Sequence, residues 1–95
     1  MVKIIGLSRE TVKDMERVER LVAIAKETFP TYMVHNIGSF IGVYREDKSD
    51  NFYVIGYRNE INIATPSKLE DSVKLATAYE RAGLGEFTVK KEYRE

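Results

Sequence analysis

The segment from Phe52 to Thr65, FYVIGYRNEINIAT, constrains the fold more than any other part of the chain. It reads as a hairpin, and a two-residue turn at Arg58 and Asn59 fixes which side chains share a face, because directly paired residues of antiparallel strands point the same way. The predicted pairs are Tyr57 with Glu60, Ile55 with Asn62 and Tyr53 with Ala64. The opposite, aliphatic face carries Phe52, Val54, Ile61 and Ile63.

The preceding run, SFIGVYR, extends the same sorting to a third strand. Pairing Arg45 with Phe52 puts Ile41 and Val43 on the aliphatic side, and Phe40, Gly42 and Tyr44 on the aromatic side. An aliphatic sheet face requires helices to cover it, which leaves the tyrosine-rich face as the candidate binding or interface surface. The residues assigned to that surface are Phe40, Tyr44, Tyr53, Ile55, Tyr57, Arg58 and Asn62.

Two amphipathic helices are predicted to supply the cover. The first is capped by Ser8 and ends at Pro30, with an apolar side formed by Val12, Met15, Val18, Val22, Ala25 and Phe29. The second begins at a capping box of Ser67 and Glu70 and ends at a glycine cap at Gly83. Its predicted apolar side consists of Leu69, Val73, Ala76 and Tyr79.

Further strands are expected on either side of these elements. Val2–Leu7 reads as a strand before the first helix, Thr31–Ile37 as a short or edge strand, and the alternation after Gly85 as a last, half-exposed strand. The sequence therefore predicts one α+β domain over residues 1–95, with two helices on one face of an antiparallel-rich sheet of five or six strands. The predicted core comprises Ile4, Val18, Val22, Ile41, Val43, Val54, Ile61, Ile63, Val73 and Ala76.

Composition narrows the function classes. Fifteen basic residues balance fifteen acidic ones, so no global field attracts polyanions. The absence of cysteine excludes disulfides, thiolate metal sites and thiol catalysis. Neither a signal peptide nor the roughly 20 apolar residues of a membrane span is present, so a cytoplasmic protein is expected. The absence of glutamine beside abundant Glu, Lys and Arg leans toward a thermophilic source.

No motif for chemistry stands out. His35 is the one histidine, and an acid/base role would need a partner that orients its ring. The acidic residues Glu46, Asp47 and Asp50 do not have the spacing of a calcium-binding loop, so their segment is interpreted as a solvated hairpin end. The glycines around Leu84 follow a helix, whereas a phosphate-binding loop follows a strand. We therefore expect no metal, no cofactor and no catalytic residue.

The runs VKIIGL, GVYREDKSDNFYVIGYRNEINIATPSKLEDSVKLATAYE and GLGEFTVKKEY together resemble one repeat of the TATA-box-binding protein. The resemblance implies the order strand, helix, three or four strands, helix, strand. That family fuses two repeats and wedges phenylalanines between bases, whereas this chain has one repeat, Gly56 near one wedge position and TYMVHNIG as an insertion. The alternative architecture is a ferredoxin-like sandwich, with Thr31–Arg45 as one long bulged strand.

These features favour a small non-enzymatic module for binding or self-association, acting through the tyrosine-rich face as a homodimer. The first alternative is nucleic-acid binding, in which the aromatic side chains stack on bases, although the zero net charge disfavours it. The second is a small enzyme or ligand pocket around His35.

Overall fold

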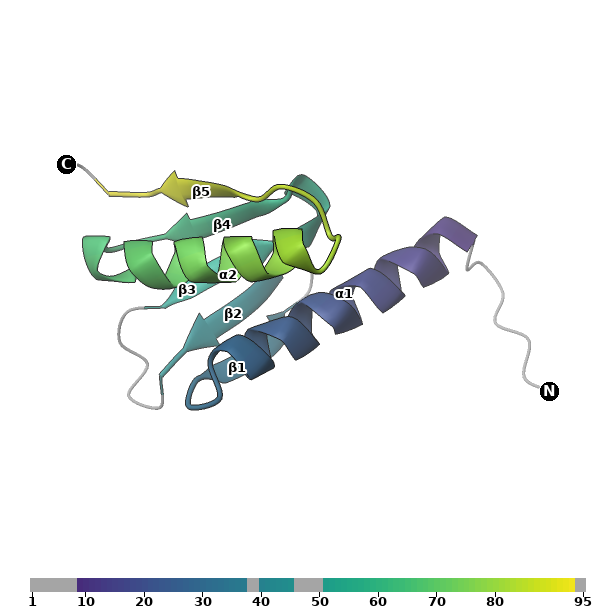
Figure 1. Cartoon of the computed structure of the whole chain (residues 1–95), viewed down its shortest axis with the longest axis horizontal. Coiled ribbons are helices and arrows are strands. Elements are labelled where there is room, and N and C mark those ends of the chain that lie inside the picture. The colour runs from purple at the N-terminus through teal and green to yellow at the C-terminus, as the bar shows by residue number, and fades with distance from the viewer. Residues whose placement is uncertain (1–8, 38–39, 46–50, 94–95) are drawn as a thin grey trace.

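The computed structural model describes residues 9–37, 40–45 and 51–93, with side chains from Met15 onward. These residues form two layers, one of helices and one of strands. The elements are α1 (Arg9–Thr28), β1 (Met33–Ile37), β2 (Phe40–Tyr44), β3 (Phe52–Ile55), β4 (Glu60–Ile63), α2 (Leu69–Arg81) and β5 (Thr88–Lys91). Short 3₁₀ turns, η1 (Gly56–Arg58) and η2 (Pro66–Lys68), precede β4 and α2. Both helices lie on the same face of the sheet (Figure 1).

The strands lie side by side in chain order, β1-β2-β3-β4-β5. The first four form an antiparallel meander, and β5 pairs parallel with β4 after the crossover through α2. The predicted α+β class, with two helices and a mostly antiparallel sheet of five strands, is confirmed. The strand predicted at Val2–Leu7 lies outside the described residues. The long bulged strand of the ferredoxin-like alternative is wrong, because its segment folds back as the β1–β2 hairpin.

Both predicted hairpin registers are displaced by two residues, yet the faces are assigned correctly. Ile55 lies opposite Glu60, because the β3–β4 connection is four residues long and ends at Asn59 in the left-handed region, with φ 51°. Asparagine tolerates that conformation better than most residues. Similarly, Val43 and not Arg45 lies opposite Phe52. An even displacement leaves each strand side chain on its predicted face, since the alternation has a period of two.

The core lies between the helices and the aliphatic face of the sheet. Its buried hydrophobic members are Leu21, Ala25, Phe29, Ile41, Val43, Phe52, Val54, Ile61, Ile63, Leu75, Tyr79 and Leu84. Of the six strand residues predicted for the core, the five that the structure describes are in this set. Val18, Val22 and Ala76 are half-buried against it, and Ile4 lies outside the described residues.

The rotation of α2 about its axis differs from the prediction. Val73, predicted to be buried, is 49% exposed, and the buried positions are Ser72, Leu75 and Tyr79. Tyr79 fixes this rotation, because its hydroxyl donates a 2.9 Å hydrogen bond to the carbonyl of Leu21 in α1. Met15 of α1, also predicted on the apolar side, is 53% exposed.

A buried lysine fixes the other end of α2. Lys68 is 4% exposed, and its Nζ donates to the hydroxyl of Tyr32 at 3.1 Å and lies 3.5 Å from Oδ2 of Asp71. The Tyr32 hydroxyl donates to that same oxygen at 2.8 Å. The three side chains therefore join the loop after α1 to the first turn of α2.

The ends of α2 contrast with each other. The predicted capping box is wrong, because Pro66 starts the 3₁₀ turn η2 and the helix begins at Leu69 with no side-chain cap. The Ser67 hydroxyl lies 2.9 Å from the hydroxyl of Thr65 instead. The glycine cap is confirmed: Gly83 has φ 79°, and the Leu84 amide donates to the carbonyl of Tyr79 at 3.0 Å.

Arg17 ties α1 to two loops at the same end of the sheet. Its guanidinium donates to the carbonyl of Gly56 at 2.7 Å, to Oδ1 of Asn59 at 2.6 Å and to the carbonyl of Leu84 at 2.9 Å. Gly56 leaves the space this needs, because a Cβ there would lie 2.8 Å from Cδ1 of Leu21. One side chain thus holds the β3–β4 turn and the α2–β5 loop against α1.

Candidate functional site

The face of the sheet turned away from α1 and α2, called the open face from here on, carries alternate residues of all five strands. By register these are Met33, His35, Ile37, Phe40, Gly42, Tyr44, Tyr53, Ile55, Glu60, Asn62, Thr88 and Lys90. Neither α1 nor α2 covers this face (Figure 1). Five of the predicted surface residues come together on it: Phe40, Tyr44, Tyr53, Ile55 and Asn62.

The other two predicted residues lie at the margin of this face. Tyr57 and Arg58 belong to the turn η1, because the four-residue connection removes both from the strands. Tyr57 is 69% exposed, and the guanidinium carbon of Arg58 lies 5.3 Å from the centre of its ring. A cation held over an exposed aromatic ring therefore stands at the end of β3.

Two pairs of aromatic rings are in contact on the open face. The rings of Phe40 and Tyr53 meet edge to face, with centroids 5.4 Å apart and an interplanar angle of 87°. His35 and Tyr44 are stacked, with centroids 5.5 Å apart and an angle of 16°. Both are favourable ring geometries, so these side chains support one another in place.

Gly42 lets the side chains lie close to the sheet. A Cβ at this position would lie 3.4 Å from Cδ1 of Ile37 and 3.6 Å from Cε1 of Tyr53, so both side chains occupy the space above the glycine. Beside them is a shallow depression of about 220 Å³, lined by Ile37, Tyr44, Asn51 and Tyr53. A ligand entering it would meet two aromatic rings and one amide.

Three acceptor oxygens on or beside the open face are buried without a hydrogen-bond partner among the described residues. They are Oδ1 of Asn51, Oε2 of Glu60 and Oδ1 of Asn62. Asn51 borders the depression, whereas Glu60 and Asn62 are successive open-face residues of β4. Because an unpaired buried acceptor is unfavourable, these three oxygens mark where the packing of this face leaves polar groups without a donor.

His35 is exposed on β1, and its ring contact is with Tyr44. No hydrogen bond or ion pair orients its nitrogens within the part of the chain that the structure describes. In that same part, no three His, Asp or Glu side chains gather in a way that could hold a metal ion. The acidic loop residues Glu46, Asp47 and Asp50 lie outside the described residues.

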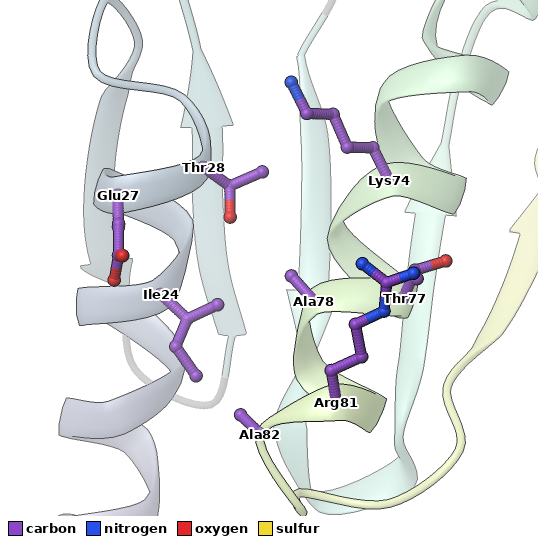
Figure 2. Close-up of a pocket in the computed structure, with 8 residues that line it drawn as sticks. All are labelled: Ile24, Glu27, Thr28, Lys74, Thr77, Ala78, Arg81 and Ala82. Atoms are coloured by element: carbon purple, nitrogen blue, oxygen red, sulfur yellow. The ribbon is translucent and has the colours of Figure 1, made fainter.

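A second concave region lies between the two helices, on the opposite layer from the open face (Figure 2). Its volume is about 700 Å³, and it is lined by Ile24, Glu27, Thr28, Lys74, Thr77, Ala78, Arg81 and Ala82. Small side chains of α2 face Ile24 of α1 across the cleft (Figure 2). Arg20 bridges the helices by donating to the carbonyl of Ala82 at 2.9 Å. Cations on α2 and a carboxylate on α1 give the cleft mixed charge.

Sequence reasoning missed the contribution of β1 to the open face. Met33, His35 and Ile37 lie opposite Tyr44, Gly42 and Phe40. The signal was present as alternation within MVHNI, but pairing could not be assigned from that segment alone. Glu60 and Asn51 were also outside the predicted set.

No family model, no curated protein and no solved structure matches this chain. Among the helices that the structure describes, none is both long enough and apolar enough to cross a membrane.

Proposed function

We propose that this chain is a small non-enzymatic module for binding or self-association that works through the open face of its sheet. The observation that carries the proposal is the two-sided sheet: both helices pack on one face, and aromatic and aliphatic side chains gather on the other. Such side chains are enriched at the desolvated centres of protein interfaces.

Exposed apolar surface on this face supports the proposal. Met33 and Ile37 are 44% and 47% exposed, and Tyr57 at the margin is more exposed still. Large apolar side chains grouped on one side of a small protein are typical of an association surface. A second copy of the chain is the partner we favour, because the net charge of zero produces no general repulsion between copies.

The test places charge on the open face. We expect Tyr53→Glu combined with Tyr57→Glu to lower the mass measured by light scattering from dimer to monomer, with the circular dichroism spectrum preserved. Val73→Glu is the control, because it puts a carboxylate on an exposed apolar residue of the helical layer. A wild-type protein that remains monomeric at high concentration would contradict self-association.

Nucleic-acid binding is the second candidate, and the aromatic rings of the open face and its margin favour it. Tyr53 and Tyr57 offer rings of the kind on which single-strand binders stack bases. Arg58 supplies a cation over the ring of Tyr57, and Lys90 is on the same face two strands away from Tyr53. Adding a mixed pool of single-stranded oligonucleotides to the same light-scattering experiment tests this. A mass increase that disappears in the tyrosine double variant would replace self-association by nucleic-acid binding.

Three finer proposals accompany the main one. The order of a TATA-box-binding-protein repeat, with Val2–Leu7 as a further strand, remains our topological proposal for the whole chain. A cytoplasmic location remains a proposal from composition. A ligand pocket around His35 is the least supported, because the histidine lies exposed on β1 with an aromatic ring as its neighbour.

A further inference from the structure

The two outer strands of the sheet differ in how they are protected. β5 carries Lys90 and Lys91, and lysine on an outer strand hinders the addition of another strand. β1, with the sequence MVHNI, has no Lys, Arg, Asp or Glu, and among the described strands only β2 pairs with it. β1 is therefore the unprotected edge.

Exposure along β1 points the same way. Four of its five residues are exposed, and Val34 is half-buried against the core. Met33 and Ile37, the two ends of the strand, are large hydrophobic residues on the open face. An exposed hydrophobic edge strand is a template for pairing with another chain.

We propose that β1 pairs antiparallel with β1 of a second copy, about a two-fold axis at His35, so that the two sheets, of five described strands each, become one continuous sheet. This inference rests on the proposed self-association but places the contact at the β1 edge of the sheet, two strands away from Tyr53. The tyrosine double variant therefore tests a contact across the open face, and variants in β1 test the edge. The axis follows from the strand length, because only the register centred on His35 pairs all five residues. It sets Met33 opposite Ile37 of the partner subunit, and Ile37 opposite Met33 of the partner subunit. Each exposed hydrophobic residue of β1 therefore faces another one.

A second copy suits this edge better than another occupant does. Antiparallel pairing about a two-fold axis is self-complementary and closed, so assembly stops at the dimer. Addition of β1 to the β5 edge of another copy would instead propagate as a filament, and Lys90 and Lys91 oppose it. In the two-fold arrangement both open faces lie on the same side, and the aromatic surface becomes continuous across the two subunits.

A single introduced cysteine tests the axis directly, because the chain has no cysteine of its own. We expect His35→Cys to form an intermolecular disulfide under mild oxidation, since opposed residues of paired strands have Cβ atoms about 5 Å apart. Lys90→Cys is the control: its two copies would lie nine strand spacings apart, or about 43 Å. Cross-linking at residue 35 should be about tenfold faster than at residue 90, because pairing raises the effective thiol concentration. Equal rates would overturn the proposal.

Charge at Asn36 gives an independent test. Asn36 is exposed, and about the proposed axis it is a diagonal neighbour of its own copy, within reach of long side chains. Asn36→Lys should convert the dimer to monomer, Asn36→Gln should leave it intact, and mixing Asn36→Lys with Asn36→Glu should restore it. Failure of the mixture to reassociate would contradict the register.

The outcomes separate this inference from the proposed function. Dissociation by the tyrosine double variant but not by Asn36→Lys would keep self-association and overturn pairing at β1. Dissociation by Asn36→Lys but not by the tyrosine variant would support pairing at β1 and remove the aromatic residues from the contact. The wild-type protein and Asn36→Lys could instead have the same mass, with the variant melting at a lower temperature. That result would mean that another part of the same chain occupies the β1 edge, which also overturns the proposal.

Discussion

Arg17 should be among the residues whose replacement most weakens the fold. Its guanidinium bonds to Gly56, Asn59 and Leu84, so Arg17→Ala removes three hydrogen bonds between segments far apart in the sequence. A hydrogen bond to a charged group contributes about 1.5 to 3 kcal/mol when well sheltered. These bonds are part-buried and water can replace the donor in part, so roughly 1 kcal/mol each, or about 3 kcal/mol in total, is the appropriate scale.

The measurement is a urea titration followed by circular dichroism. Arg20→Ala is the matched control, because Arg20 lies one turn away on α1 and makes one exposed bond to the carbonyl of Ala82. That control should change the free energy of unfolding by no more than about 0.5 kcal/mol. Arg17→Lys should recover less than half of the loss, because one ammonium cannot match the fork of a guanidinium.

Hydrogen exchange would locate the effect. The Thr88 amide donates to the carbonyl of Asn59 at 2.8 Å, so β5 is joined to the turn that Arg17 holds. Arg17→Ala should therefore raise exchange at Thr88 and Leu84 more than at the strand amides of β2. A stability loss equal to that of Arg20→Ala, with unchanged exchange at Thr88, would refute the structural role of Arg17.

Three further variants test the packing. Ile63→Ala should lower the free energy of unfolding by roughly 2 to 5 kcal/mol in denaturant titration, because Ile63 is fully buried between helices and sheet. Ser67→Ala should change the melting temperature little, because Ser67 makes no cap to α2; a loss near 1 kcal/mol would restore the capping box. Burial raises the pKa of Tyr79 above its ordinary value of 10.0, and nearby Arg17 opposes the shift. The folded state thus favours the neutral phenol, so stability should be full below about pH 10 and fall above it, and Tyr79→Phe should flatten that fall.

The sheet faces could be predicted from sequence because strand alternation is local. Phe52, Val54, Ile61 and Ile63 are buried as predicted, although both hairpin registers are displaced by two residues. The alternation has no information about how many residues a turn uses. Asn59, in the left-handed conformation at the end of the β3–β4 connection, accepts a hydrogen bond from Arg17 of α1. That contact joins residues 42 positions apart in the chain.

The candidate site shows the same division. Period-two alternation correctly predicted that five residues share the open face: Phe40, Tyr44, Tyr53, Ile55 and Asn62. The pairing of β1 with β2, seen only in the structure, adds the residues of β1 to the same face. The rotation of α2 was decided by tertiary contacts: the Tyr79 bond to Leu21 and the buried Lys68 turn Val73 outward. Sequence by itself determined the element types and the two-sided sheet, because these follow from local periodicity and burial. Only the tertiary structure decided turn lengths, helix rotation and which strand is left as the uncharged edge, because each of these depends on contacts between distant segments.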